Sequence, residues 1–119
     1  MAEQKEFEKS EIFRFNEEVD YIEGGIASRN IIKKPAGNIS LFAFDKGEGL
    51  SEHTAPFDAL VFVTEGNAEI TIDKKVFNLQ SGDSLIMPAN IPHALKAKEK
   101  FKMVLTMIKE KEDKKNSDS

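Results

Sequence analysis

The sequence predicts an all-β fold, an antiparallel sandwich or barrel, because short apolar segments alternate regularly with turn residues. The segments are rich in β-branched and aromatic residues, which suit a pleated, half-buried surface; they span residues 39–44, 60–63, 68–72, 76–79, 84–87 and 101–108. Glycine, proline, asparagine or aspartate falls between them, at 35–37, 47–49, 65–67, 73–75, 81–83 and 88–92. A turn roughly every ten residues is typical of an antiparallel sandwich or barrel.

The last apolar segment, 101–108, has a length that suits either a short helix or a strand. Its larger apolar side chains occupy alternate positions from Phe101 to Met107, and they share one face only at a period of two residues. A strand is therefore the better prediction.

The length of 119 residues is that of one domain. We expect a β-barrel domain over residues 11–108, with disordered segments at 1–10 and 109–119. Both flanking segments are dominated by charged and polar residues, which bury too little apolar surface to offset the entropy lost on ordering. Phe7 is the candidate for docking onto the domain from the first of these segments.

The composition excludes several classes of function. The net charge of −4 argues against a nucleic-acid surface, which needs clustered basic residues. The absence of cysteine excludes disulfides, thiolate metal ligands and a cysteine nucleophile, and it fits a cytoplasmic protein. The first ten residues lack the apolar stretch of a secretory signal, and the longest apolar run, 59–63, is far shorter than the ~20 residues that span a bilayer. We expect a cytoplasmic protein without nucleic-acid or membrane partners.

The chain contains two histidines, His53 and His93, and each lies in a turn–strand–turn setting. His53 follows a loop that contains Gly47, and Gly66 comes thirteen residues later. His93 follows a glycine turn, an apolar strand and a turn bracketed by two prolines. Two similar halves of the chain therefore each bring one histidine to the start of a strand.

These spacings resemble the two sequence motifs of the cupin family. The first motif is matched in the spacing of Gly47, His53 and Gly66, and the second in that of Gly82, Pro88 and His93. The resemblance covers about half of the expected domain. It implies an antiparallel double-stranded β-helix, the jelly-roll barrel of cupins, in which the histidines face a common interior.

The sequence departs from the family at the metal ligands. A complete cupin metal site has two histidines and a glutamate in the first motif and one histidine in the second. Here Ala55 stands at the second histidine position and Ala59 at the glutamate position, so two of the four expected ligands are missing. The nearby carboxylates, Glu52 and Asp58, are each one residue out of register, and the alternation of a strand directs them to the opposite face.

Three interpretations of the histidine pair stay open: buried imidazoles without a function, a ligand-binding or acid–base site without metal, and a metal site with incomplete protein ligation. We prefer a small-molecule-binding cupin in which His53 and His93 are polar anchors in an apolar barrel pocket, with little or no metal. The alternative is a metal-dependent enzyme of the dioxygenase or isomerase type, in which His53 and His93 hold a zinc, nickel, manganese or iron ion.

The resemblance also implies a homodimer that exchanges N-terminal strands. The segment 11–34 supports this prediction because it carries more apolar residues than an unpaired sheet edge can safely expose; they are Ile12, Phe13, Tyr21, Ile22, Ile31 and Ile32. We expect the barrel to be filled by Phe42, Phe44, Phe57, Phe62, Phe101, Met87, Met103 and Met107. We expect Arg14 and Arg29 to face solvent or an interface.

Overall fold

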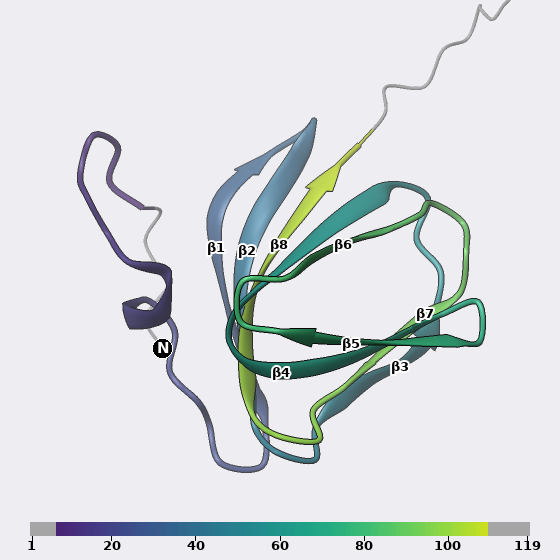
Figure 1. Ribbon diagram of the computed structural model, residues 1–119. Helices are drawn as coiled ribbons and strands as arrows, with labels where there is room; N and C mark the ends of the chain where they lie inside the picture. The colour runs from purple at the N-terminus through teal and green to yellow at the C-terminus, as the bar shows by residue number, and fades with distance from the viewer. Residues whose placement is uncertain (1–6, 110–119) are drawn as a thin grey trace, which may run out of the picture.

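The computed structural model describes residues 7–109, so the predicted disorder of 1–6 and 110–119 lies outside the described residues. A single 3₁₀ turn precedes eight strands that curl around a common interior (Figure 1). In chain order the elements are η1 (Phe15–Glu17), β1 (Ile26–Lys34), β2 (Gly37–Phe44), β3 (Gly49–His53), β4 (Asp58–Ile72), β5 (Lys75–Gln80), β6 (Ser84–Met87), β7 (His93–Lys96) and β8 (Phe101–Ile108). Within residues 7–109, no helix has the length and apolar character needed to cross a membrane.

The strands form two layers that share β4. The first half of β4 pairs with β6 and β8, and β8 continues through β2 to β1. The second half of β4 pairs with β5 and β7, and β7 continues to β3. Every one of these pairings is antiparallel, which confirms the predicted all-β antiparallel barrel.

The turn predicted at 65–67 is wrong, because β4 runs through these residues without ending. The strand bends there from one layer to the other, with a register shift against β8 between Val63 and Glu65. Gly66 has φ 81, and a Cβ built on it would lie 2.2 Å from the carbonyl oxygen of Lys100. A glycine is therefore required by both the backbone conformation and the space, as at many bulges where a strand changes sheets.

The predicted apolar segments correspond to five strands, β2, β4, β5, β6 and β8. The segment 101–108 is a strand, as predicted, and it lies between β2 and β4. Three strands, β1, β3 and β7, lie outside the predicted apolar segments. Four of the five residues of β3 are exposed, so it shows no alternation of apolar and polar residues along the chain.

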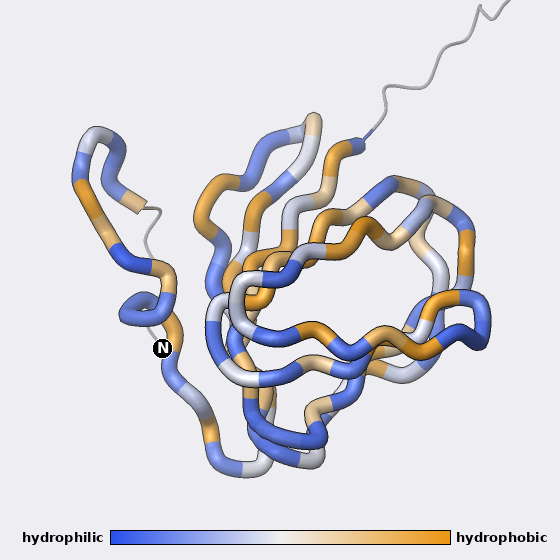
Figure 2. The backbone as a smooth tube through the Cα atoms, viewed as in Figure 1, coloured by the Kyte–Doolittle hydropathy of each residue, from blue (hydrophilic) through white to orange (hydrophobic). Residues whose placement is uncertain are grey.

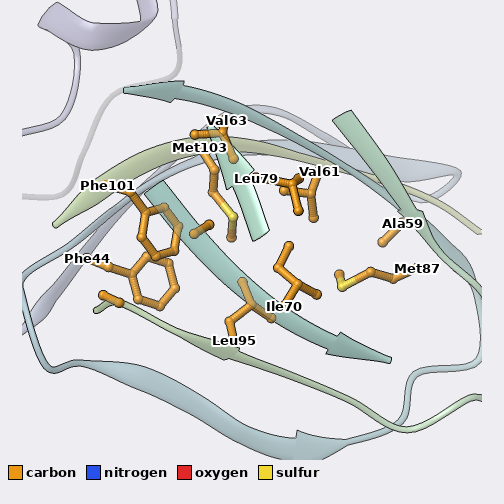
Figure 3. Packing of buried hydrophobic residues seen from close by; sticks show 12 residues of the cluster. Phe44, Ala59, Val61, Val63, Ile70, Leu79, Met87, Leu95, Phe101 and Met103 are labelled. Atoms are coloured by element: carbon orange, nitrogen blue, oxygen red, sulfur yellow. The ribbon is translucent and has the colours of Figure 1, made fainter. Parts of the chain in front are cut away.

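The main core fills the space between the two layers. Phe44 and Phe101 stack at 4.6 Å between ring centroids and close one end of this interior, while Ala59 and Met87 lie toward the other end (Figure 3). Hydrophobic and hydrophilic residues alternate along several strands (Figure 2). Phe44, Phe101, Met87 and Met103 are core residues, as predicted from the sequence. The same prediction is wrong for Phe62, which packs outside this core because its neighbours in β4, Val61 and Val63, face the interior.

A second apolar cluster lies on the opposite face of β2, β4 and β8, which we call the outer face. Leu41, Ala43 and Val104 are buried there beneath Val19 and Phe7 of the N-terminal segment. Phe7 thus docks onto the domain, and the guanidinium of Arg29 lies 4.2 Å from its ring centroid. Arg29 also pairs with Glu18 at 2.7 Å, so its charge is balanced within the chain.

Polar groups fix the N-terminal segment to the end of the barrel away from Ala59. The ammonium of Lys102, a buried residue, donates to the backbone carbonyl of Asn16 at 2.7 Å. The hydroxyl of Tyr21 donates to Glu65 at 2.7 Å. Burial and the adjacent Glu65 carboxylate raise the pKa of Tyr21 well above its ordinary value, so the phenol remains a donor.

Candidate functional site

The two histidines lie side by side, as their positions in the two motifs predicted. His53 is the last residue of β3, His93 is the first of β7, and the two are paired in the register of these strands. Their ring centroids are 4.4 Å apart and the rings are inclined by 64°. The prediction that each histidine begins a strand is right for His93 and wrong for His53, which ends one.

A bulge in β3 brings His53 opposite His93. Leu50 pairs with Leu95 and His53 pairs with His93, so β3 has one residue more than β7 between the two pairs. In a regular strand Leu50 and His53 would lie on opposite faces, and the extra residue places both on the face toward the interior. His93 is 6% exposed, whereas His53 is open to solvent, so the pair reaches from the core to the surface.

Backbone carbonyls hold both rings in the same way. Nδ1 of His53 lies 2.8 Å from the carbonyl oxygen of Ser51, and Nδ1 of His93 lies 3.2 Å from that of Ile91. A carbonyl oxygen only accepts hydrogen bonds, so Nδ1 is the donor in each neutral ring and Nε2 carries the lone pair. Sequence reasoning had no signal for these partners, because they are main-chain groups.

Apolar residues lie on the core side of the pair, and we call this region the histidine end of the barrel. Ile72 pairs with His93, and Ala59 lies across the interior, paired with Met87. Ala59 is 6% exposed and its side chain belongs to the interior core (Figure 3). The position of the expected glutamate therefore does face the interior, as the resemblance implied.

Two loops border the histidine end and are joined by a hydrogen bond. The amide of Asn90 donates to the carbonyl oxygen of Ala55 at 2.7 Å, which links the loop before β4 to the loop before β7. Asn90 has φ 65 at the place where the cupin motif has glycine. Asparagine tolerates this left-handed conformation better than most residues, so the substitution preserves the loop.

The nearby carboxylates do not complete a metal site. Asp58 is exposed on the outer face and its Oδ1 accepts a hydrogen bond from the amide of Ala89 at 2.8 Å. Glu52 is exposed as well. Among residues 7–109, no three histidine, aspartate or glutamate side chains come together. Catalytic zinc sites use three protein ligands, so the donor set of two imidazoles does not fit a complete cupin metal site.

On the outer face, a largely apolar groove of about 510 Å³ adjoins the histidine end. Leu60, Ile86 and Ile108 contribute to it and are 41%, 62% and 68% exposed. We call these three residues the outer apolar patch.

The fold and these motifs define the chain as a cupin. Residues 40–109 match the cupin domain family, and the chain belongs to it. The expected jelly-roll barrel is thereby confirmed.

Solved structures show the same relationship. A conserved protein of unknown function from Streptococcus pyogenes is 34% identical, with a TM-score of 0.85 over 94% of this chain and 98% of that one. A cupin 2 conserved barrel domain protein from Leptotrichia buccalis is 45% identical over 82% of this chain, with a TM-score of 0.79; the match covers 47% of that protein, about half its length.

Salicylate 1,2-dioxygenase from Pseudaminobacter salicylatoxidans is similar in fold alone, at 16% identity over 71% of this chain and 26% of that one, with a TM-score of 0.66. A search of curated proteins found no match.

Proposed function

We propose that this protein is a small-molecule-binding cupin in which His53 and His93 anchor the ligand, with little or no resident metal. The observation that carries the proposal is the contact of two imidazoles, 4.4 Å apart, at an apolar end of the barrel. Small-ligand sites commonly combine an apolar lining with a few polar groups that fix the orientation of the ligand. The two alanines, Ala55 and Ala59, reduce the affinity for metal and leave the imidazoles available for the ligand.

The alternative function is that of a metal-dependent enzyme of the dioxygenase or isomerase type. The observation in its favour is that Nε2 of both histidines carries a lone pair, as a metal ligand must. His53 and His93 would then hold a zinc, nickel, manganese or iron ion, which supplies Lewis-acid or redox chemistry when bound. The presence of only two imidazole ligands favours the small-molecule-binding function.

Metal content separates the two functions. Elemental analysis of protein purified without chelator is expected to give much less than one equivalent of metal, and calorimetric titration with the four ions is expected to show weak binding. The matched variants are His93→Phe, which removes one of the two possible metal ligands, and Glu52→Gln, which changes an exposed neighbour of His53. One equivalent of metal that is lost in His93→Phe and kept in Glu52→Gln would establish the enzyme alternative instead.

We also propose that the protein is a homodimer that uses its outer apolar patch. The three residues of the patch are exposed together beside an apolar groove, and exposed apolar patches often mark interaction sites. Ile12 of the N-terminal segment is 99% exposed, which supports a dimer in which the partner also contacts this segment. The absence of cysteine supports a cytoplasmic location.

A further inference from the structure

The buried imidazole of His93 retains an acceptor for which the described residues supply no donor. His93 is 6% exposed, and its ring makes one protein hydrogen bond in residues 7–109, from Nδ1 to Ile91. A buried acceptor left unsatisfied costs about 1–3 kcal/mol, so buried polar groups nearly always have a partner. The Nε2 atom of His93 therefore requires a donor from water or from a ligand.

His53 repeats this arrangement at the surface end of the pair. Its Nδ1–H is also used by a carbonyl, so neither neutral ring has an N–H left to offer. The pair consists of two acceptors on adjacent rings, with the outer one open to solvent. A ligand can approach from the side of His53 and displace water from His93.

The core side chains described at the histidine end supply no donor. Ala59, Met87 and Ile72 are apolar. Lys75 is in register with Ile72 on the far side of β4 from His93, so it lies on the same face of the sheet, two strands away from His93. Its ammonium lies 5.3 Å from the ring centroid of Phe77. An anion placed against the imidazoles would thus face two lone pairs, whereas a hydroxyl or amine could donate a hydrogen bond to Nε2 of either ring.

From this geometry we infer the chemical class of the ligand: an apolar molecule that presents a hydroxyl, amine or amide donor to Nε2 of His53 and His93, in preference to a carboxylate. The inference rests on the proposed function, since it concerns the same site. The preference for a hydrogen-bond donor over a carboxylate comes from two backbone carbonyls, which fix the protons of both rings on Nδ1.

The first experiment determines the tautomers. A long-range ¹H–¹⁵N correlation spectrum of the chelator-treated full chain at mildly alkaline pH contains the signals of two imidazoles, and His53→Gln assigns them. The expected result is a protonated Nδ1 and an unprotonated Nε2 in both rings. A protonated Nε2 in either ring would overturn the inference and leave the proposed function standing.

The second experiment compares probes that share one apolar body: benzyl alcohol, benzylamine and benzoate. The alcohol and the amine are expected to shift both Nε2 resonances and to bind about tenfold more tightly than benzoate, the effect of one to two net hydrogen bonds. His93→Phe should weaken alcohol binding by a similar factor, and Glu52→Gln should not. Benzoate binding as tightly as the alcohol, with the same Nε2 shifts, would overturn the inference alone. No Nε2 shift with any probe would overturn the proposed function and the inference together.

Discussion

Restoring the two missing ligands is expected to create a strong metal site. Ala59 faces the interior at the histidine end, so Ala59→Glu would direct a carboxylate toward the pair, and Ala55→His would supply a third imidazole from the bordering loop. The donor set would rise from two to four. Loss of a single outer-shell partner already lowers metal affinity 10–100-fold, so two added ligands should strengthen binding by roughly a hundred- to ten-thousand-fold.

The same change makes stability depend on metal. Ala59→Glu alone places a carboxylate among Met87 and other core residues, and we expect it to destabilise the fold by about 3 kcal/mol. Metal at a hundred times its Kd should return about 2.7 kcal/mol to the double variant. Urea unfolding with and without chelator measures both effects, and calorimetric titration with zinc, manganese, nickel and ferrous iron gives the affinities.

The matched control combines Ala55→His with Leu60→Glu. Leu60 is adjacent to Ala59 but points to the outer face, so its carboxylate should leave the affinity at that of Ala55→His alone. A repaired variant that binds metal no better than this control would refute the placement of Ala55 and Ala59 at ligand positions. Tight metal binding by the natural chain would refute the proposal that its site holds little or no metal.

Three further predictions follow from the fold. Gly66→Ala should lower the free energy of unfolding in urea by more than about 2 kcal/mol, whereas Gly47→Ala, where a Cβ meets nothing within 4 Å, should cost about 1 kcal/mol from its positive φ alone. Light scattering is expected to give a dimer mass for the natural chain and a monomer mass for Ile86→Lys; a natural monomer would contradict the proposed interface. The hydrogen bond from the Gly24 amide lowers the pKa of Asp45 below its ordinary value, so Asp45→Asn should reduce stability at neutral pH. The difference should disappear as the pH falls through that lowered pKa.

The sequence predicted those parts of the fold in which local pattern and burial agree. The period of two in 101–108 identified β8 because its alternate residues pack into the interior. Gly66 was misinterpreted because glycine marks a turn and a bulge equally well, and only the pairing partner of a strand decides between them. β3 was missed because it is an edge strand and four of its five residues are exposed, so it carries no alternating apolar pattern.

The sequence predicted which side chains lie together in the site, but not which nitrogen of each imidazole carries the proton. Motif spacing placed His53 beside His93, and strand alternation directed Asp58 outward, as the structure shows. The tautomer of each ring depends on a carbonyl two residues earlier in the chain, at Ser51 and Ile91. Which way those carbonyls point is set by the bulge in β3 and by the loop before β7, which no local sequence pattern specifies.

The continuity of β4 through its bend has a consequence for how the molecule opens. Since both layers bond to this one strand, neither layer can separate without breaking bonds of β4. Slowly exchanging amides in β2 and β7 should therefore become exposed in the same global opening, with a common free energy, rather than in two steps. A ligand held by the histidines at one end would then slow amide exchange in β2, a strand that bears neither histidine.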